Sequence, residues 1–195
     1  MLHRPRRLVF TAAALCLVAA CTPTAPTSAP SPAPSYRCTP EAGGDEFDCT
    51  QAQYDEMVAK DKLYAEAEAV YRKFFAEDVR IFRAGGITKA SAVLLETTTG
   101  DFLQDSMNLY RSFVAEERKI VGGEVKIAAL QRLPGLSKAG SVVALRACTD
   151  ASTTTTHIRG KAVGPGGAGE DTLYFGRVDG VLKIQGADGK AVKSC

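Results

Sequence analysis

The tract from Thr22 to Ser35 limits which part of this chain can fold. It contains only Thr, Pro, Ala and Ser, and its prolines stand at positions 23, 26, 30, 32 and 34. Such a tract has no large apolar side chains to bury, and it favours an extended polyproline-like backbone of about 3.1 Å per residue. The sequence therefore predicts an extended tether over residues 21–35 and one folded domain over residues 36–195.

An export signal is predicted ahead of the tether. Three arginines precede an apolar run that is too short to span a bilayer as a mature helix. The run ends in Leu17-Val18-Ala19-Ala20-Cys21, which resembles a bacterial lipobox. The resemblance implies that residues 1–20 are a cleaved signal peptide and that Cys21 is the lipid attachment site, carrying acyl chains such as palmitate. The alternative is an ordinary signal peptide with a cysteine at that position by chance.

The cysteines of the mature chain predict two disulfides. Cys16 leaves with the signal and Cys21 carries the lipid, so the cysteines that remain are Cys38, Cys49, Cys148 and Cys195. An even number of exported cysteines is typical of disulfides, and the lack of a C-x-x-C motif disfavours a metal site. Three pairings are possible. We favour Cys38–Cys49 with Cys148–Cys195, because the first two are close in sequence and precede the first predicted helix.

Helical periodicity begins at Thr50. Thr50 and Gln53 have the spacing of a capping box, and an apolar stripe continues for about 30 residues to Gly85-Gly86. A short second helix is predicted from Thr88 to about Glu96. A third is predicted from Gly100 to the Gly122-Gly123 pair.

Residues after Gly123 predict strands instead of helices. The runs rich in β-branched residues are 124–133, 141–149, 153–163, 172–178 and 181–184. Asp179-Gly180 is the clearest hairpin signal, and Gly164–Gly169 is interpreted as a mobile hairpin loop. Helices followed by strands favour an α+β fold with an antiparallel sheet.

The order of these elements and three local motifs resemble those of NTF2-like proteins, specifically the small exported lipoproteins of actinobacteria. The motifs are Tyr36–Gly44, Arg146–Asp150, and the hairpin Asp179–Ile184 ahead of the terminal Ser194-Cys195. The resemblance implies a cone-shaped α+β fold, in which about three N-terminal helices pack on a strongly curved antiparallel sheet. A conical pocket would lie between them. Related cones serve enzymes, transport factors and binding modules, so the resemblance does not fix a function.

Charge and histidine content exclude several classes of function. The formal net charge is +2, and three of the positive charges lie in the signal segment, so the mature chain has no basic footprint for nucleic acid. His157 is the only histidine of the mature chain, which excludes a paired-histidine zinc site, and no calcium-loop motif occurs. We therefore expect no metal, no cofactor and no nucleic-acid partner.

We expect a non-catalytic protein, anchored by lipid to the outer face of the cell membrane, whose domain binds a small apolar ligand or an envelope protein. One alternative is an isomerase- or dehydratase-type enzyme that uses the pocket. Another is a structural adaptor whose cone is filled by side chains. An enzyme would need tyrosine hydroxyls opposite a desolvated Asp acting as base. The predicted pocket residues are Tyr64, Tyr71, Asp105 and Tyr110.

Overall fold

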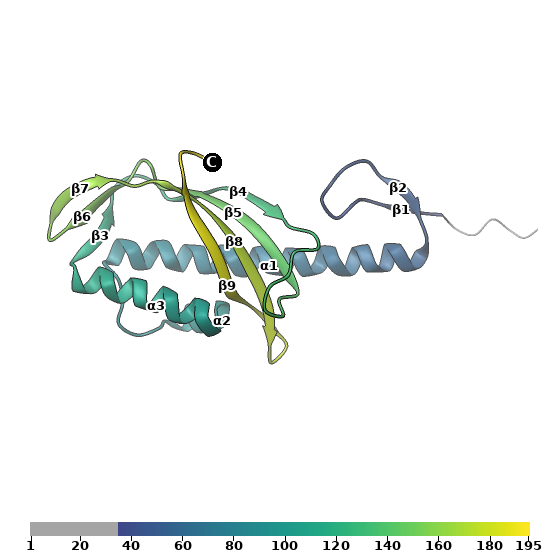
Figure 1. Cartoon of the computed structure of the whole chain (residues 1–195), viewed down its shortest axis with the longest axis horizontal. Helices are drawn as coiled ribbons and strands as arrows, with labels where there is room; N and C mark the ends of the chain where they lie inside the picture. Colours follow the sequence, from purple (N-terminus) through teal and green to yellow (C-terminus); the bar gives the residue numbers. More distant parts are fainter. Residues whose placement is uncertain (1–34) are drawn as a thin grey trace, which may run out of the picture. The chain divides into compact units, whose positions relative to one another are not determined.

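The computed structural model describes residues 35–195, which contain three helices and nine strands, arranged as Figure 1 shows. The predicted signal peptide (1–20), the lipid site Cys21 and the tether as far as Pro34 lie outside the described residues.

The long helix α1 (Gln51–Ala84) runs beside the sheets along most of the length of the described residues (Figure 1). The Thr50 side chain accepts a hydrogen bond from the Gln53 backbone N–H, and the Gln53 side chain accepts one from the Thr50 N–H, at 2.9 Å. This confirms the predicted capping box. The helix ends at Ala84, and its C-cap is Gly85, whose φ of 89° is left-handed and favours glycine. At 1.5 Å per residue, α1 is about 50 Å long.

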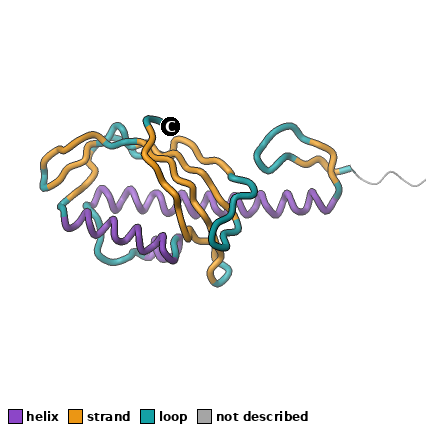
Figure 2. The backbone as a smooth tube through the Cα atoms, viewed as in Figure 1, coloured by secondary structure: helices purple, strands orange, loops and turns teal. Residues whose placement is uncertain are grey.

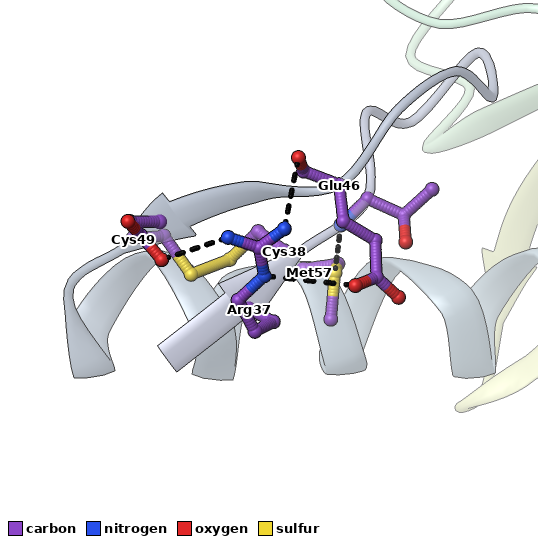
Figure 3. Close-up of polar contacts among 7 residues, drawn as sticks. Arg37, Cys38, Glu46, Cys49 and Met57 are labelled. Carbon is purple, nitrogen blue, oxygen red and sulfur yellow. Dashed lines mark hydrogen bonds and ion pairs between the residues drawn. A yellow bond between two sulfur atoms is a disulfide. The ribbon is translucent and has the colours of Figure 1, made fainter. Parts of the chain in front are cut away.

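The first part of α1 packs on a small hairpin instead of on the large sheet. Its buried residues begin only at Tyr64. Near its start lies the two-stranded sheet of β1 (Tyr36–Cys38) and β2 (Phe47–Cys49), which the Cys38–Cys49 disulfide closes. The Thr39 N–H lies 3.2 Å from the Met57 sulfur of α1. Figure 3 shows Met57 beside the disulfide. The disulfide and these contacts therefore hold the hairpin on the helix.

A four-stranded antiparallel sheet provides one side of the core, and the helices provide the other. Its strands, in spatial order, are β4 (Lys126–Arg132), β5 (Val143–Asp150), β8 (Ala168–Val178) and β9 (Val181–Val192). The buried face of α1 packs with the buried residues of β5, β8 and β9, and the sheet crosses α1 in Figure 1. Asp179 and Gly180 have φ values of 51° and 80°, which a tight hairpin turn between β8 and β9 requires. The predicted hairpin is therefore confirmed.

The remaining strands form a third sheet near the C-terminal end of α1 (Figure 2). Its order is β3 (Arg118–Val121), β6 (Thr155–Ile158) and β7 (Lys161–Pro165). The chain leaves the large sheet after β5 because the Asp150 side chain accepts the Ser152 N–H at 2.8 Å and turns the backbone. The following strand β6 then pairs with β3 instead of extending β5.

The predicted fold class, an α+β NTF2-like cone, is wrong. In place of about three N-terminal helices packed on one curved antiparallel sheet, the described chain has nine strands in three separate sheets. One sheet precedes all three helices. The helices also differ greatly in length, since α1 has 34 residues and α2 (Ala92–Thr97) has only 6. The turn after Asp150 explains part of the difference, because it diverts a hairpin of strands into a sheet of its own.

A glycine sets the distance between α1 and α3 (Gly100–Ala115). A Cβ atom on Gly86, just after α1, would lie 2.2 Å from the Tyr110 carbonyl oxygen and 2.9 Å from Phe113 Cβ, and its φ is 92°. Only glycine fits a left-handed backbone in such close contact. The end of α1 therefore lies directly against the C-terminal half of α3, where Tyr110 stands.

Both disulfides of the structure join the cysteines that the sequence analysis favours. Cys38 is bonded to Cys49, and Cys148 on β5 is bonded to Cys195 beyond β9. Structural disulfides indicate an oxidising, extracytoplasmic environment. Among residues 35–195, no helix combines the length and the apolar character needed to cross a membrane.

Candidate functional site

A cavity of about 310 Å³ lies between α1, α3 and the four-stranded sheet. We call it the Asp78 cavity. Its walls are largely aromatic and aliphatic. From α1 they comprise Tyr71, Phe74, Phe75, Asp78 and Phe82; from α3 Phe102, Ser106, Leu109 and Tyr110; and from the strands and loops Ile120, Val125, Thr149, Ala151, Asp171, Leu173 and Ala187.

The helical repeat of α1 places Asp78 among aromatic rings. Asp78 lies four residues after Phe74 and four before Phe82, and residues at this spacing share one face of a helix. Of the α1 residues that line the cavity, Asp78 alone carries a charge. It is partly buried, and the cavity adjoins it.

Tyr110 on α3 reaches Asp78 across the cavity wall. Its hydroxyl donates a hydrogen bond of 2.7 Å to Asp78 Oδ1. Burial raises the pKa of Asp78 to about 7, although the bond from Tyr110 opposes this shift, and the charge of Asp171 adds to it. Burial and the neighbouring Asp78 also hold the pKa of Tyr110 well above its usual value. Asp78 therefore exchanges its proton near neutral pH while Tyr110 stays protonated.

Asp171 and Tyr71 bring two further polar groups to the cavity. Within residues 35–195, neither the Asp171 carboxylate nor the Tyr71 hydroxyl makes a hydrogen bond, and neither is among the fully enclosed unpaired atoms, so both keep accessible surface. Burial raises the pKa of Asp171, and the charge of Glu170 adds to this. Burial, then the charges of Asp171 and Asp78, raises the pKa of Tyr71, which shows that the three groups interact.

The predicted pocket residues do not form one site. Tyr71 and Tyr110 both line the Asp78 cavity. Asp105 is exposed and lines a different cavity of about 430 Å³, the Asp105 cavity, together with Lys138 and Tyr174. Tyr64 lies elsewhere on α1, where its hydroxyl donates to Glu41 at 2.8 Å. The two tyrosines therefore share a cavity with Asp78, and not with Asp105.

Neither carboxylate of the Asp78 cavity is among the predicted pocket residues, although a sequence pattern marks each of them. Asp78 interrupts the apolar stripe of α1 between Phe74 and Phe82. Asp171 precedes the buried Leu173 by two residues, and residues two apart share one face of a strand. A charged residue within an apolar period indicates a buried polar site, and this rule would have found both.

The two cavities are adjacent. Phe102, Ser106, Leu109 and Ala187 line both of them, so a shared layer of side chains from α3 and β9 lies where the Asp78 cavity meets the Asp105 cavity. A ligand in the Asp78 cavity would meet aromatic walls on α1, two carboxyl groups, and this shared layer.

In the part of the chain that the structure describes, no three His, Cys, Asp or Glu residues are grouped so as to hold a metal ion. The Asp78 cavity combines apolar walls with a few convergent polar groups. The chain matches no protein-family model, and comparison with curated proteins gave no match.

Proposed function

We propose that this protein is a lipid-anchored protein of the cell envelope, held at the outer membrane face by Cys21, whose Asp78 cavity binds a small, mostly apolar ligand. The observation that carries the proposal is the cavity itself, about 310 Å³ in volume and lined by aromatic rings around Asp78. Ligand pockets have this character and begin at about this volume. The open volume favours ligand binding over a structural adaptor with a filled pocket.

Binding of a neutral apolar dye tests the ligand function. We expect the full-length protein in phosphatidylcholine nanodiscs to enhance Nile red fluorescence beyond that of empty nanodiscs. Ala187→Phe should abolish the additional signal, because the new ring would occupy the cavity that Ala187 lines. Ala191→Phe on the same strand is the matched control, since Ala191 is exposed and lies outside the cavity. Equal signals from both variants would contradict binding in the Asp78 cavity.

Replacement of the lipidated cysteine tests the anchor. Cys21→Ser removes the thiol that a lipobox presents for acylation, so we expect incorporation of labelled palmitate to fall to background. The other cysteines should not contribute, because Cys38, Cys49, Cys148 and Cys195 are disulfide-bonded. Unchanged palmitate labelling of Cys21→Ser would contradict the proposed anchor.

A second candidate function is proton transfer to or from a bound ligand. The observation that favours it is the pKa of Asp78, about 7, since a general acid or base works best near the operating pH. A compound that binds both wild type and Asp78→Asn but is turned over only by wild type would assign this activity.

A further inference from the structure

We infer that the ligand of the Asp78 cavity carries a protonated amine, which binds at the carboxyl groups of Asp78 and Asp171 while the rest of the ligand packs on the aromatic walls. This inference rests on the proposed ligand-binding function and specifies its chemical class.

The charged groups of the Asp78 cavity are all acidic. Two carboxyl groups line the Asp78 cavity, and among the described residues no lysine, arginine or histidine lines it. Two other acids, by contrast, each have a cationic partner on α1. Glu77, which is buried, pairs with Arg80 at 2.6 Å, and Glu41 pairs with Lys60 at 2.9 Å. Because buried charges in proteins are normally paired, the missing cation is best supplied by the ligand.

The two carboxyl groups also have free hydrogen-bond acceptors. Tyr110 satisfies one oxygen of Asp78, while the Asp171 carboxylate has no donor within residues 35–195. An ammonium group offers three N–H donors and no acceptor, which matches these free acceptors. An anionic ligand would be repelled, and a ligand without donors would leave desolvated acceptors unpaired, which is unfavourable.

Aromatic rings form the wall of the cavity beside Asp78. The Tyr71 ring centroid lies 6.1 Å from that of Phe75 and 6.5 Å from that of Phe74, so three rings gather beside Asp78. Aromatic faces attract cations electrostatically within about 6 Å of the ring centroid. The same rings bury the apolar body of the ligand, so one wall serves both parts of an apolar amine.

Three compounds of nearly equal shape test the inference: naphthylmethylamine, naphthylmethanol and naphthoate. We expect calorimetry at pH 8 on the full-length protein in phosphatidylcholine nanodiscs, corrected with empty nanodiscs, to show the amine binding at least about tenfold more tightly than the alcohol. Naphthoate should bind more weakly than either. The uncharged lipid keeps partition of the amine into the bilayer low, and the correction removes the rest.

Charge-neutral variants locate the selectivity. Asp78→Asn and Asp171→Asn should each lower the affinity for the amine at least about tenfold and leave the affinity for the alcohol within about twofold. Asp105→Asn is the control and should change neither, because Asp105 lies in the neighbouring cavity. Equal or tighter binding of the alcohol by wild type, with Nile red still bound, would overturn the amine inference alone. Failure of all three compounds and of Nile red would overturn the ligand-binding function as well.

Discussion

Asp78→Asn is expected to raise the free energy of unfolding by about 3 to 4 kcal/mol at pH 8 and to change it little at pH 4. In the folded protein the pKa of Asp78 is about 7, against an ordinary value of 3.8. Each unit of difference corresponds to about 1.4 kcal/mol between the two protonation states. Asparagine has nearly the same shape and can still accept the Tyr110 hydrogen bond. Urea denaturation at several pH values measures the effect.

The sign follows from proton uptake. Between about pH 4 and 7 the folded protein keeps a proton on Asp78 that the unfolded chain has released, so stability falls as pH rises through this window. Above pH 7 the full penalty of a buried carboxylate is present. Asp171, whose pKa is also raised, likewise makes stability fall as pH rises. The lowered pKa of Glu77, beside Arg80, has the opposite effect, because it makes stability fall as pH drops below the ordinary pKa of a glutamate.

The difference between wild type and variant isolates Asp78, because Asp171, Glu77, Glu170, Tyr71 and Tyr110 are present in both. Asp105→Asn controls for loss of one negative charge at an exposed position of α3 and should change stability by less than about 0.5 kcal/mol. If Asp78→Asn proved less stable than wild type at pH 8, the carboxyl group would not be desolvated as the structure indicates.

A carboxyl group that destabilises its own fold gives a reason to seek its function. Replacing it with an amide would stabilise the domain, yet the aromatic cavity forms around it. Groups that lower stability in this way are characteristic of binding and catalytic sites, where activity and stability conflict. A gain of stability in Asp78→Asn would therefore support a functional role for Asp78 independently of the ligand-binding measurements.

Local sequence signals predicted several elements of the fold correctly. The Thr50–Gln53 capping box depends only on residues three apart, and the Asp179-Gly180 turn depends on two neighbours that tolerate positive φ. The second helix begins at Ala92, after Ser91 as N-cap, and not near Thr88. Boundaries of this kind depend on which of several polar residues provides the cap, so they are harder to predict than the existence of the element.

Pairing between distant strands could not be predicted in the same way. The run 153–163 was expected to be one strand, but a turn at Arg159-Gly160, both with positive φ, folds it into β6 and β7. Strand β3 was missed because it is only four residues long and follows α3 almost directly. Gly164–Gly169 was expected to be a mobile loop, yet strand residues occupy all of it but Gly166-Gly167. These strands form through partners that no local pattern identifies.

The pocket prediction failed for a related reason. The prediction for Asp105 assumes that it faces the tyrosines across a conical pocket, and this fold has no such cone. Tyr71 and Tyr110 do share a cavity, because both lie on apolar stripes that face the core. Their polar partner is Asp78, which the Gly86 contact between α1 and α3 brings within reach of Tyr110. Tertiary contact of this kind is visible only in the structure.

Removal of the Cys148–Cys195 disulfide by the double variant Cys148→Ala/Cys195→Ala is expected to lower the free energy of unfolding by about 4 kcal/mol. The bond closes a loop with a sequence separation of 47 residues, and the chain-entropy relation gives about this value for such a loop. The bond also joins β5 to the segment that follows β9. In the sheet, β8 lies between β5 and β9. Urea denaturation of both proteins under oxidising conditions measures the difference.

The Cys38→Ala/Cys49→Ala variant is the matched comparison. Its loop has a sequence separation of only 11 residues, so the same relation gives about 3 kcal/mol, and the hairpin that it closes packs on the first turns of α1, outside the main core. We therefore expect its loss to loosen β1, β2 and the start of α1 locally, with faster amide hydrogen exchange there than around Tyr71.

In the Cys148→Ala/Cys195→Ala variant, exchange should instead increase across β5, β8 and β9. Because Thr149, which lines the Asp78 cavity, directly follows Cys148, this second variant should also bind Nile red less well. A larger loss of stability from the hairpin disulfide than from Cys148–Cys195 would show that the N-terminal part of α1, and not the four-stranded sheet, limits the stability of the domain.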